Sequence, residues 1–184
     1  MEILTLGNEL LKQKAKPVKE IGPEYIKIAG DLFEALQEGK GIGLAGPQVG
    51  LMERIFAIHL EGDEPRVFIN PSIVETSQET LKYEEGCLSV PGIYCDVIRP
   101  RAIKVQAWNE KGRPFNLEAS GLMARVILHE YDHLEGILFI DRIPEQKRNR
   151  ILAKMEKAKA PRNGSGRDAP EQNTQPQPGS RQEA

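Results

Sequence analysis

Residues 128–137 read LHEYDHLEGI, and they contain the pattern H-E-x-x-H as His129, Glu130 and His133. Residues four apart lie on one face of an α-helix, so both imidazoles can reach the same metal ion. Glu130 follows the first histidine and can stand beside the metal as the general base for a bound water. The chain has only 3 histidines, and two of them fall at this spacing. The stretch therefore predicts a metal-binding helix that the rest of the fold encloses.

The segments around this helix show helical and strand patterns. Three helices are expected, at 23–38, 120–136 and 144–159. Four short strands are expected, at 54–60, 66–70, 71–77 and 102–108. The turn NEKGR after the last strand predicts a hairpin. This order predicts an α+β fold with mainly antiparallel strands packed around a central metal-binding helix, followed by a C-terminal helix.

Composition limits the classes of protein to consider. The net charge is -2 over 184 residues, which gives no reason to expect DNA as a partner. No apolar run approaches the ~20 residues needed to span a bilayer, and the N-terminus lacks the pattern of a signal peptide. The chain contains only 2 cysteines, Cys87 and Cys95, so a disulfide framework is not expected. A cytoplasmic enzyme is the expectation.

The domain organisation is expected to be simple. Residues 1–160 have the length and apolar content of a single catalytic domain. Residues 161–184 contain no isoleucine, leucine, valine or aromatic residue. Such a low-complexity tail has little apolar surface to offset the entropy of ordering, and it is expected to be disordered.

A catalytic metal site usually takes three protein ligands, so the chain has to supply one more. The extended pattern H-E-x-x-H-x-x-G-x-x-H fails because position 139 is phenylalanine. Cys87, in the stretch YEEGCLSVPG at 83–92, follows Gly86, which lets the backbone approach another group closely. Cys87 is therefore the favoured third ligand.

Two other functions remain open at this point. In a metallopeptidase of the H-E-x-x-H type, Glu156 in the C-terminal helix would be the third ligand and Cys87 would have no role. In a non-catalytic zinc-binding protein, Cys95 would close the site as a fourth ligand. A closed structural site has no use for Glu130, which argues against the second alternative.

Three stretches, in this order, make the chain similar to the peptide deformylases. They are GIGLAGPQ at 41–48, EGCLS at 85–89 and HEYDHLEG at 129–136. Weaker similarity extends over roughly residues 1–158. The resemblance implies a hydrolase that removes the formyl group from the N-terminal formylmethionine of newly made polypeptides.

The resemblance also implies roles for particular residues. Cys87, His129 and His133 would be the metal ligands, and Glu130 would be the catalytic base. The side chain of Gln48 and the backbone amide of Leu88 would stabilise the oxyanion. The implied native metal is Fe(II), although a thiolate with two imidazoles also suits Zn, Ni or Co.

Substrate binding is expected next to the metal helix. The resemblance implies that the region of Gly43 pairs with an extended N-formylmethionyl peptide and that a pocket takes the methionine side chain. Helical spacing predicts Leu122, Arg125 and Val126 on the pocket face, and the glycine-rich loop contributes Gly43 and Ile42. Gly86, before Cys87, is the remaining expected substrate-binding residue. The guanidinium of Arg125 is expected to reach solvent while its aliphatic stem lines the wall.

Two further expectations concern charged residues. Asp132 is expected either on a solvated face or as a partner that orients a ligand histidine or an arginine such as Arg101. The C-terminal helix is basic, and it is expected either to be a solvated face or, as the resemblance implies, to approach the ribosome. Its basic residues are Lys147, Arg148, Arg150, Lys154, Lys157 and Lys159.

Overall fold

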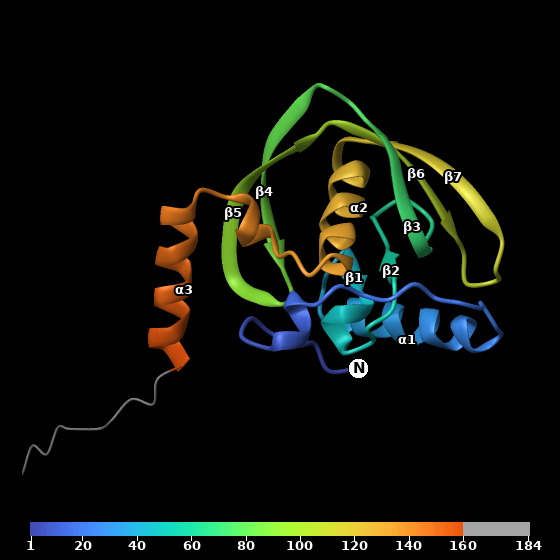
Figure 1. Cartoon of the computed structure of the whole chain (residues 1–184), viewed down its shortest axis with the longest axis horizontal. Helices are drawn as coiled ribbons and strands as arrows, with labels where there is room; N and C mark the ends of the chain where they lie inside the picture. Colours follow the sequence, from blue (N-terminus) through green and yellow to red (C-terminus); the bar gives the residue numbers. More distant parts are fainter. Residues whose placement is uncertain (160–184) are drawn as a thin grey trace, which may run out of the picture.

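The computed structural model describes residues 1–159, and the tail predicted at 161–184 lies outside them. The described chain has the α+β fold expected from the sequence, with antiparallel strand pairs throughout its two sheets. Figure 1 shows the predicted metal-binding helix, α2 (Gly121–Leu134), between a larger sheet and a long hairpin. Within residues 1–159 no helix is long and apolar enough to cross a membrane.

The larger sheet has five strands in the order β1-β2-β3-β6-β7. Their bounds are Gly43–Ala45 for β1, Ile55–Ile58 for β2, Arg66–Thr76 for β3, Ala102–Trp108 for β6 and Pro114–Ser120 for β7. All four side chains of β2 are buried because both faces of this part of the sheet are covered. Phe56 packs in the cluster beneath α2, whereas Ile55 packs in the cluster that contains α1 (Glu24–Glu38).

The second sheet is the hairpin of β4 (Thr80–Cys87) and β5 (Val90–Pro100), joined by a turn at Leu88 and Ser89. Neither strand was predicted from the sequence. The one fully buried side chain of β4 is that of Glu85, so the strand lacks the alternation of apolar and polar residues that marks a half-buried strand.

The two strands predicted at 66–70 and 71–77 are a single strand, β3. Pro71 has no backbone N–H and breaks the apparent pattern. The strand passes this point through an irregularity, with a register shift between Ile69 and Ser72 and a positive φ of 49° at Asn70. Strands β1 and β7 were also not predicted, although the hairpin turn between β6 and β7 was.

The helices lie close to their expected ranges, and the last is α3 (Glu145–Lys159). Short 3-10 helices occur at η1 (Glu9–Lys12), η2 (Gly46–Val49) and η3 (Phe139–Arg142). A third apolar cluster joins η3 and α3 to β5, and its buried members include Val97 and Phe139. This cluster fixes the β4–β5 hairpin against the segment that follows α2.

Gly136 is expected to be essential for stability. It follows α2 with a positive φ of 72°, and an added Cβ would overlap the backbone carbonyl of Lys12. We expect Gly136→Ala to lower the free energy of unfolding by more than the ~1–2 kcal/mol of left-handed strain alone, because the neighbouring backbone must also move. Urea denaturation measures this. The control is Gly62→Ala, which has a φ of 80° but open space around the added Cβ, and an equal loss in both variants would contradict the argument.

Candidate metal centre and substrate cavity

Three side chains from two distant segments meet at one end of α2. The helix places His129 and His133 on one face, and the end of β4 brings Cys87 to them. The Sγ atom of Cys87 lies 3.3 Å from Nε2 of His133. The potential ligand atoms of all three residues lie within 4.8 Å of one another, and no other such group of histidine, cysteine and acidic side chains occurs within residues 1–159.

The chemistry of these donors suits a divalent transition metal. A thiolate and two imidazoles form a donor set that such ions prefer. His133 is 1% exposed and its Nδ1 has no hydrogen-bond partner, which leaves Nε2 as the nitrogen directed at the sulfur. Burial holds the pKa of His133 well below its ordinary value, so the ring is neutral and ready to bind a cation.

The other two candidate ligands are not part of the ligand group formed by Cys87, His129 and His133. Glu156 is exposed on α3, and Cys95 is a buried member of the apolar cluster around β5 and η3. Neither belongs to the ligand group, so the described structure supports neither the Glu156 nor the Cys95 alternative.

Glu85 orients His129 through the ring nitrogen that faces away from the other candidate ligands. One carboxylate oxygen lies 2.9 Å from Nδ1 of His129, which directs the other ring nitrogen towards the ligand group. Arg99 and Arg125 both donate to the same carboxylate, at 2.6 Å and 2.7 Å. Burial alone would raise the pKa of Glu85, but hydrogen bonds from His129 and Arg99 lower it to about 2.

The pKa of His129 depends on the same neighbouring groups. Burial disfavours the imidazolium, but the Cys87 sulfur and the Glu85 carboxylate outweigh this effect and raise the pKa of His129 to about 10. A bound metal cation would replace that proton, because a ligating histidine has to be neutral. The site is therefore electrostatically prepared for a positive charge at this position.

Glu130 lies next to the ligand group with one free oxygen. It is 3% exposed, and its Oε2 atom has no hydrogen-bond partner. Burial raises its pKa to about 7 despite the nearby positive charges of His129 and Arg99. The other carboxylate oxygen lies against the Cα of Gly43, where any side chain would overlap it. A buried carboxylate with an unpaired oxygen and a pKa near neutrality has the properties of a general base.

Gln48 and Leu88 lie beside Cys87 and line one cavity with it. The Gln48 carbonyl oxygen accepts a 2.8 Å bond from the Ala45 backbone N–H, which fixes the amide orientation. Its amide nitrogen then donates to Cys87 Sγ at 3.4 Å and to Ser89 Oγ at 3.1 Å. Leu88 follows Cys87 directly, so its backbone N–H lies beside the sulfur.

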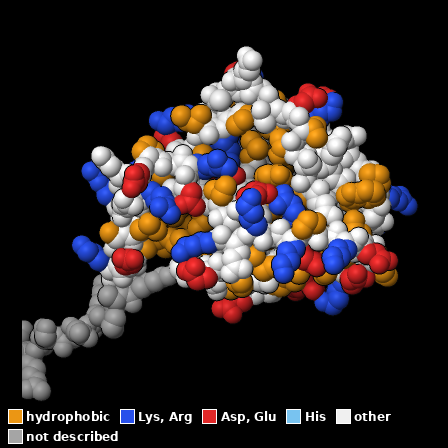
Figure 2. Space-filling view, viewed as in Figure 1, with side chains coloured by type: hydrophobic (Ala, Val, Ile, Leu, Met, Phe, Trp, Pro, Cys, Tyr) orange, Lys and Arg blue, Asp and Glu red, His pale blue; other side chains and the backbone are white. Residues whose placement is uncertain are grey.

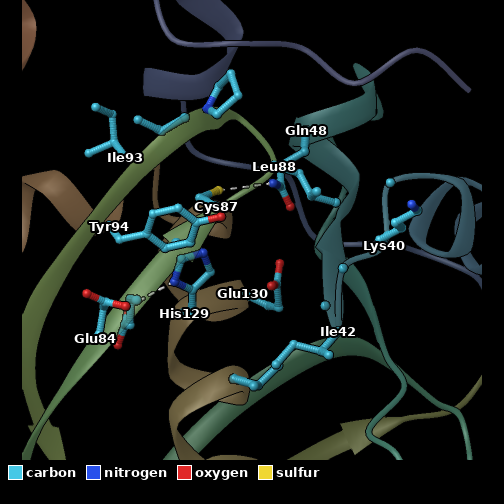
Figure 3. Close-up of a pocket in the computed structure, with 18 of the residues that line it drawn as sticks. Lys40, Ile42, Gln48, Glu84, Cys87, Leu88, Ile93, Tyr94, His129 and Glu130 are labelled. Carbon is cyan, nitrogen blue, oxygen red and sulfur yellow. Dashed lines mark hydrogen bonds and ion pairs between the residues drawn. The ribbon is translucent and has the colours of Figure 1, made fainter.

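This cavity of about 510 Å³ lies between β1 and the β4–β5 turn, next to the candidate metal ligands, as seen in Figure 3. The labelled side chains of Cys87, His129 and Glu130 face this space. Every residue expected to bind substrate lines it, namely Gly43, Ile42, Gly86, Leu122, Arg125 and Val126. Gln48 and Leu88 line it as well. His133 does not line the cavity but lies behind it, with its ligand atom near those of Cys87 and His129.

The expectations for Arg125 and Asp132 need correction. The guanidinium of Arg125 does not reach solvent, because it donates to Glu85 and to the backbone carbonyls of Val97 and Leu81. Asp132 is a buried partner of an arginine, but that arginine is not Arg101, which pairs with the exposed Glu79. Arg99 and Arg142 bind Asp132 instead.

Sequence reasoning missed part of the cavity and its support. Glu85 stood inside a quoted motif without an assigned role, and Arg99 received none. Tyr94 was also missed, although its ring covers Gly86 and lines the cavity. The alternation of residues after Pro91 was the one signal that could have indicated a strand here, and with it the position of Tyr94.

Comparisons with known proteins agree with this geometry. The model of the family described as polypeptide deformylase matches residues 1–149. The peptide deformylase of Neisseria meningitidis serogroup C is 50% identical over 159 residues, covering 85% of this chain and 95% of that protein.

Two solved structures extend the similarity to the fold. The Synechococcus elongatus peptide deformylase in complex with actinonin has a TM-score of 0.79 and 42% identity, covering 84% of this chain and 85% of that one. The Legionella pneumophila enzyme has a TM-score of 0.80 and 37% identity, covering 86% and 94%. The chain belongs to the polypeptide deformylase family, metal-dependent hydrolases that remove the formyl group from the N-terminal formylmethionine of newly made polypeptides.

Proposed function

We propose that this chain hydrolyses N-formylmethionyl peptides with Cys87, His129 and His133 as metal ligands and Glu130 as the general base. The observation that carries this assignment is the unpaired Oε2 atom of buried Glu130 beside the cysteine and histidine group. The proposed catalytic unit is the single domain of residues 1–160.

Fe(II) is the proposed native metal, with Zn, Ni or Co as substitutes, because the resemblance to the family implies iron and the donor set suits all four. When bound, such an ion acidifies water and polarises a carbonyl oxygen.

The protein groups have distinct tasks in the hydrolysis. Glu130 accepts a proton from the attacking water and returns it to the leaving α-amine, for which a pKa of about 7 is well matched to neutral pH. The backbone N–H of Leu88 would donate to the oxyanion that develops on the formyl oxygen. The Gln48 amide would do the same once the N–H that donates to Cys87 Sγ turns from the sulfur to the oxyanion, while the other stays on Ser89 Oγ. Loss of one such donor typically costs ~2.7–4 kcal/mol of transition-state stabilisation.

The same cavity would bind the peptide. The backbone of Gly43 and Ile42 on one wall and of Gly86 on the other would pair with an extended substrate. The methionine side chain would pack between Ile42 and the α2 residues Leu122 and Val126. Arg125 would contribute a rigid wall, since its guanidinium is held by Glu85 and two backbone carbonyls.

Gly43 provides a test of how closely Glu130 has to be placed. In Gly43→Ala the new methyl group overlaps the Glu130 carboxylate, which has to swing away. Displacement by about 1 Å can cost ~10²-fold in rate, so we expect at least that loss of kcat/KM with the melting temperature little changed. Gly30→Ala, where an added Cβ meets nothing, is the control and should be fully active. Full activity in Gly43→Ala would show that this contact is unimportant.

The function itself is tested by formate release. The full chain, purified without oxygen and loaded with Fe(II), is incubated with N-formyl-Met-Ala-Ser, and formate is measured with time. We expect rapid release from this peptide and none from N-acetyl-Met-Ala-Ser, whose extra methyl group crowds the reacting carbonyl. A folded, metal-loaded protein that releases no formate would contradict the proposal.

The setting is proposed to be cytoplasmic, where nascent formylated chains emerge, with α3 approaching the ribosome. Figure 2 shows charged side chains projecting from this helix. Its described basic residues are Lys147, Arg148, Arg150, Lys154 and Lys157. The triple variant Lys147→Glu, Arg150→Glu, Lys154→Glu should lose co-sedimentation with ribosomes at low salt, because the basic face then repels RNA phosphates. Unchanged co-sedimentation would refute this role.

A further inference from the structure

The Asp132 carboxylate accepts hydrogen bonds from two arginines that come from different parts of the chain. It lies on α2 three residues after His129, and its side chain is 6% exposed. Arg99 of β5 donates to Oδ2 at 2.8 Å. Arg142, the last residue of η3, donates to the same oxygen through Nε at 3.0 Å and to Oδ1 through its terminal nitrogen. Arg142 therefore makes a bidentate interaction with both carboxylate oxygens, which is the strongest geometry for an arginine and a carboxylate.

From Asp132 a continuous series of contacts leads to the metal group. Arg99 bridges Asp132 and Glu85, and Glu85 in turn holds Nδ1 of His129. The side chains of Arg99 and Glu85 are only 5% and 4% exposed. No member can shift alone without leaving a buried charge partly unpaired, which is costly. The orientation of the His129 ring therefore depends on how Asp132 is held.

The η3 turn touches the histidine by a second route. The ring of Phe139, at the start of the turn, lies 6.1 Å from that of His129 between centroids and is nearly parallel to it, at 25°. The turn is closed by a 2.9 Å hydrogen bond from the backbone of Leu138 to Asp141. One short segment thus supports the ring by packing at one end and by an ion pair at the other.

We propose that Arg142 is a positioning residue for the metal centre. Its bidentate ion pair with Asp132 fixes the positions of Arg99 and Glu85, and through them the orientation of the His129 ring. The inference rests on the proposed function only in taking His129 as a metal ligand. Arg142 is itself 45% exposed, so its removal takes little apolar packing from the fold.

The test uses the full chain loaded with Co(II) and compares Arg142→Ala, Arg142→Lys and the control Arg101→Ala. Arg101 is also an ion-paired arginine, but it is 55% exposed and pairs only with exposed Glu79. Three quantities are measured on each: the dissociation constant of Co(II), by equilibrium competition with a chelator, the visible spectrum of the bound Co(II), and kcat and KM for N-formyl-Met-Ala-Ser. Thermal unfolding confirms that each variant is folded.

In Arg142→Ala we expect Co(II) affinity to fall about tenfold, the lower end of the range for residues that support metal ligands. The Co(II) spectrum should shift and kcat should fall with KM unchanged. Arg142→Lys keeps the charge but not the two-point contact, so it should recover only part of the loss. Wild-type metal affinity and spectrum in folded Arg142→Ala or Arg142→Lys, or an equal loss in Arg101→Ala, would overturn the proposal. Because metal affinity does not require turnover, this result is independent of whether formate is released.

Discussion

Replacing Glu130 by glutamine is expected to abolish formate release while the metal stays bound. The amide has nearly the same size and shape, but it cannot accept a proton from water. Loss of general base catalysis typically costs ~10²–10⁴-fold in rate. The Glu130 oxygen Oε2 has no hydrogen-bond partner in the described chain, so the exchange breaks no bond there. It also removes the cost of burying a charge, so the fold should be no less stable.

The measurement is kcat for formate release together with bound metal per chain. Glu118→Gln is the matched control, because it makes the same chemical change at a side chain that is 81% exposed on β7. The control should retain wild-type kcat and metal content. Activity within a few-fold of wild type in Glu130→Gln would mean that another group takes the proton, and the assignment of Glu130 would have to be abandoned.

Replacing Cys87 by serine is expected to remove the metal and with it the activity. Cysteine binds metals as a thiolate, whereas a serine hydroxyl stays protonated near pH 7 and is a far weaker ligand for transition metals. The substitution is nearly isosteric, so the turn between β4 and β5 should keep its form. We expect bound metal to be lost on dialysis and formate release to fall to background.

Bound metal is measured after dialysis, and thermal unfolding is followed in parallel. Cys95→Ala is the control, because this second cysteine is 4% exposed in an apolar cluster and is not part of the ligand group. It should keep both metal and activity, with some loss of stability from the small cavity. Retention of metal and turnover by Cys87→Ser would contradict the ligand set and revive the alternative in which the thiol has no role.

The parts of the fold that were predicted correctly depend on local periodicity. The first and last helices were found because apolar residues recur at helical spacing, and β6 because its buried side chains alternate. The middle helix was found from the H-E-x-x-H motif and from the residues that mark its two ends. The β4–β5 hairpin was missed because Glu85, a charged residue, occupies the buried position of β4. A sequence pattern cannot show that this carboxylate will be paired with Arg99, 14 residues further along the chain.

The site, like the fold, has parts that local sequence predicts and parts that it does not. Sequence alone determined His129, Glu130 and His133 as one unit, because a helix turns every ~3.6 residues and so sets their common face without help from the rest of the chain. Cys87 was favoured as the third ligand because a catalytic site needs one more donor and Gly86 precedes it, and the resemblance implied the same role, whereas the role of Gln48 came from the resemblance alone. Nothing in the local sequence places Cys87 beside His133, 46 residues further along, or Gln48 beside Cys87, 39 residues further along.

Only the tertiary structure decided what surrounds that unit. Helical spacing correctly put Arg125 on the cavity wall, but the direction of its guanidinium depended on Glu85 and on one backbone carbonyl each from β4 and β5. Arg99 and Arg142 likewise reach Asp132 from β5 and η3. Periodicity fixes which face of a helix a residue occupies. The partner of a buried charge is fixed by packing, because a charge removed from water has to be paired by whatever the fold brings near it.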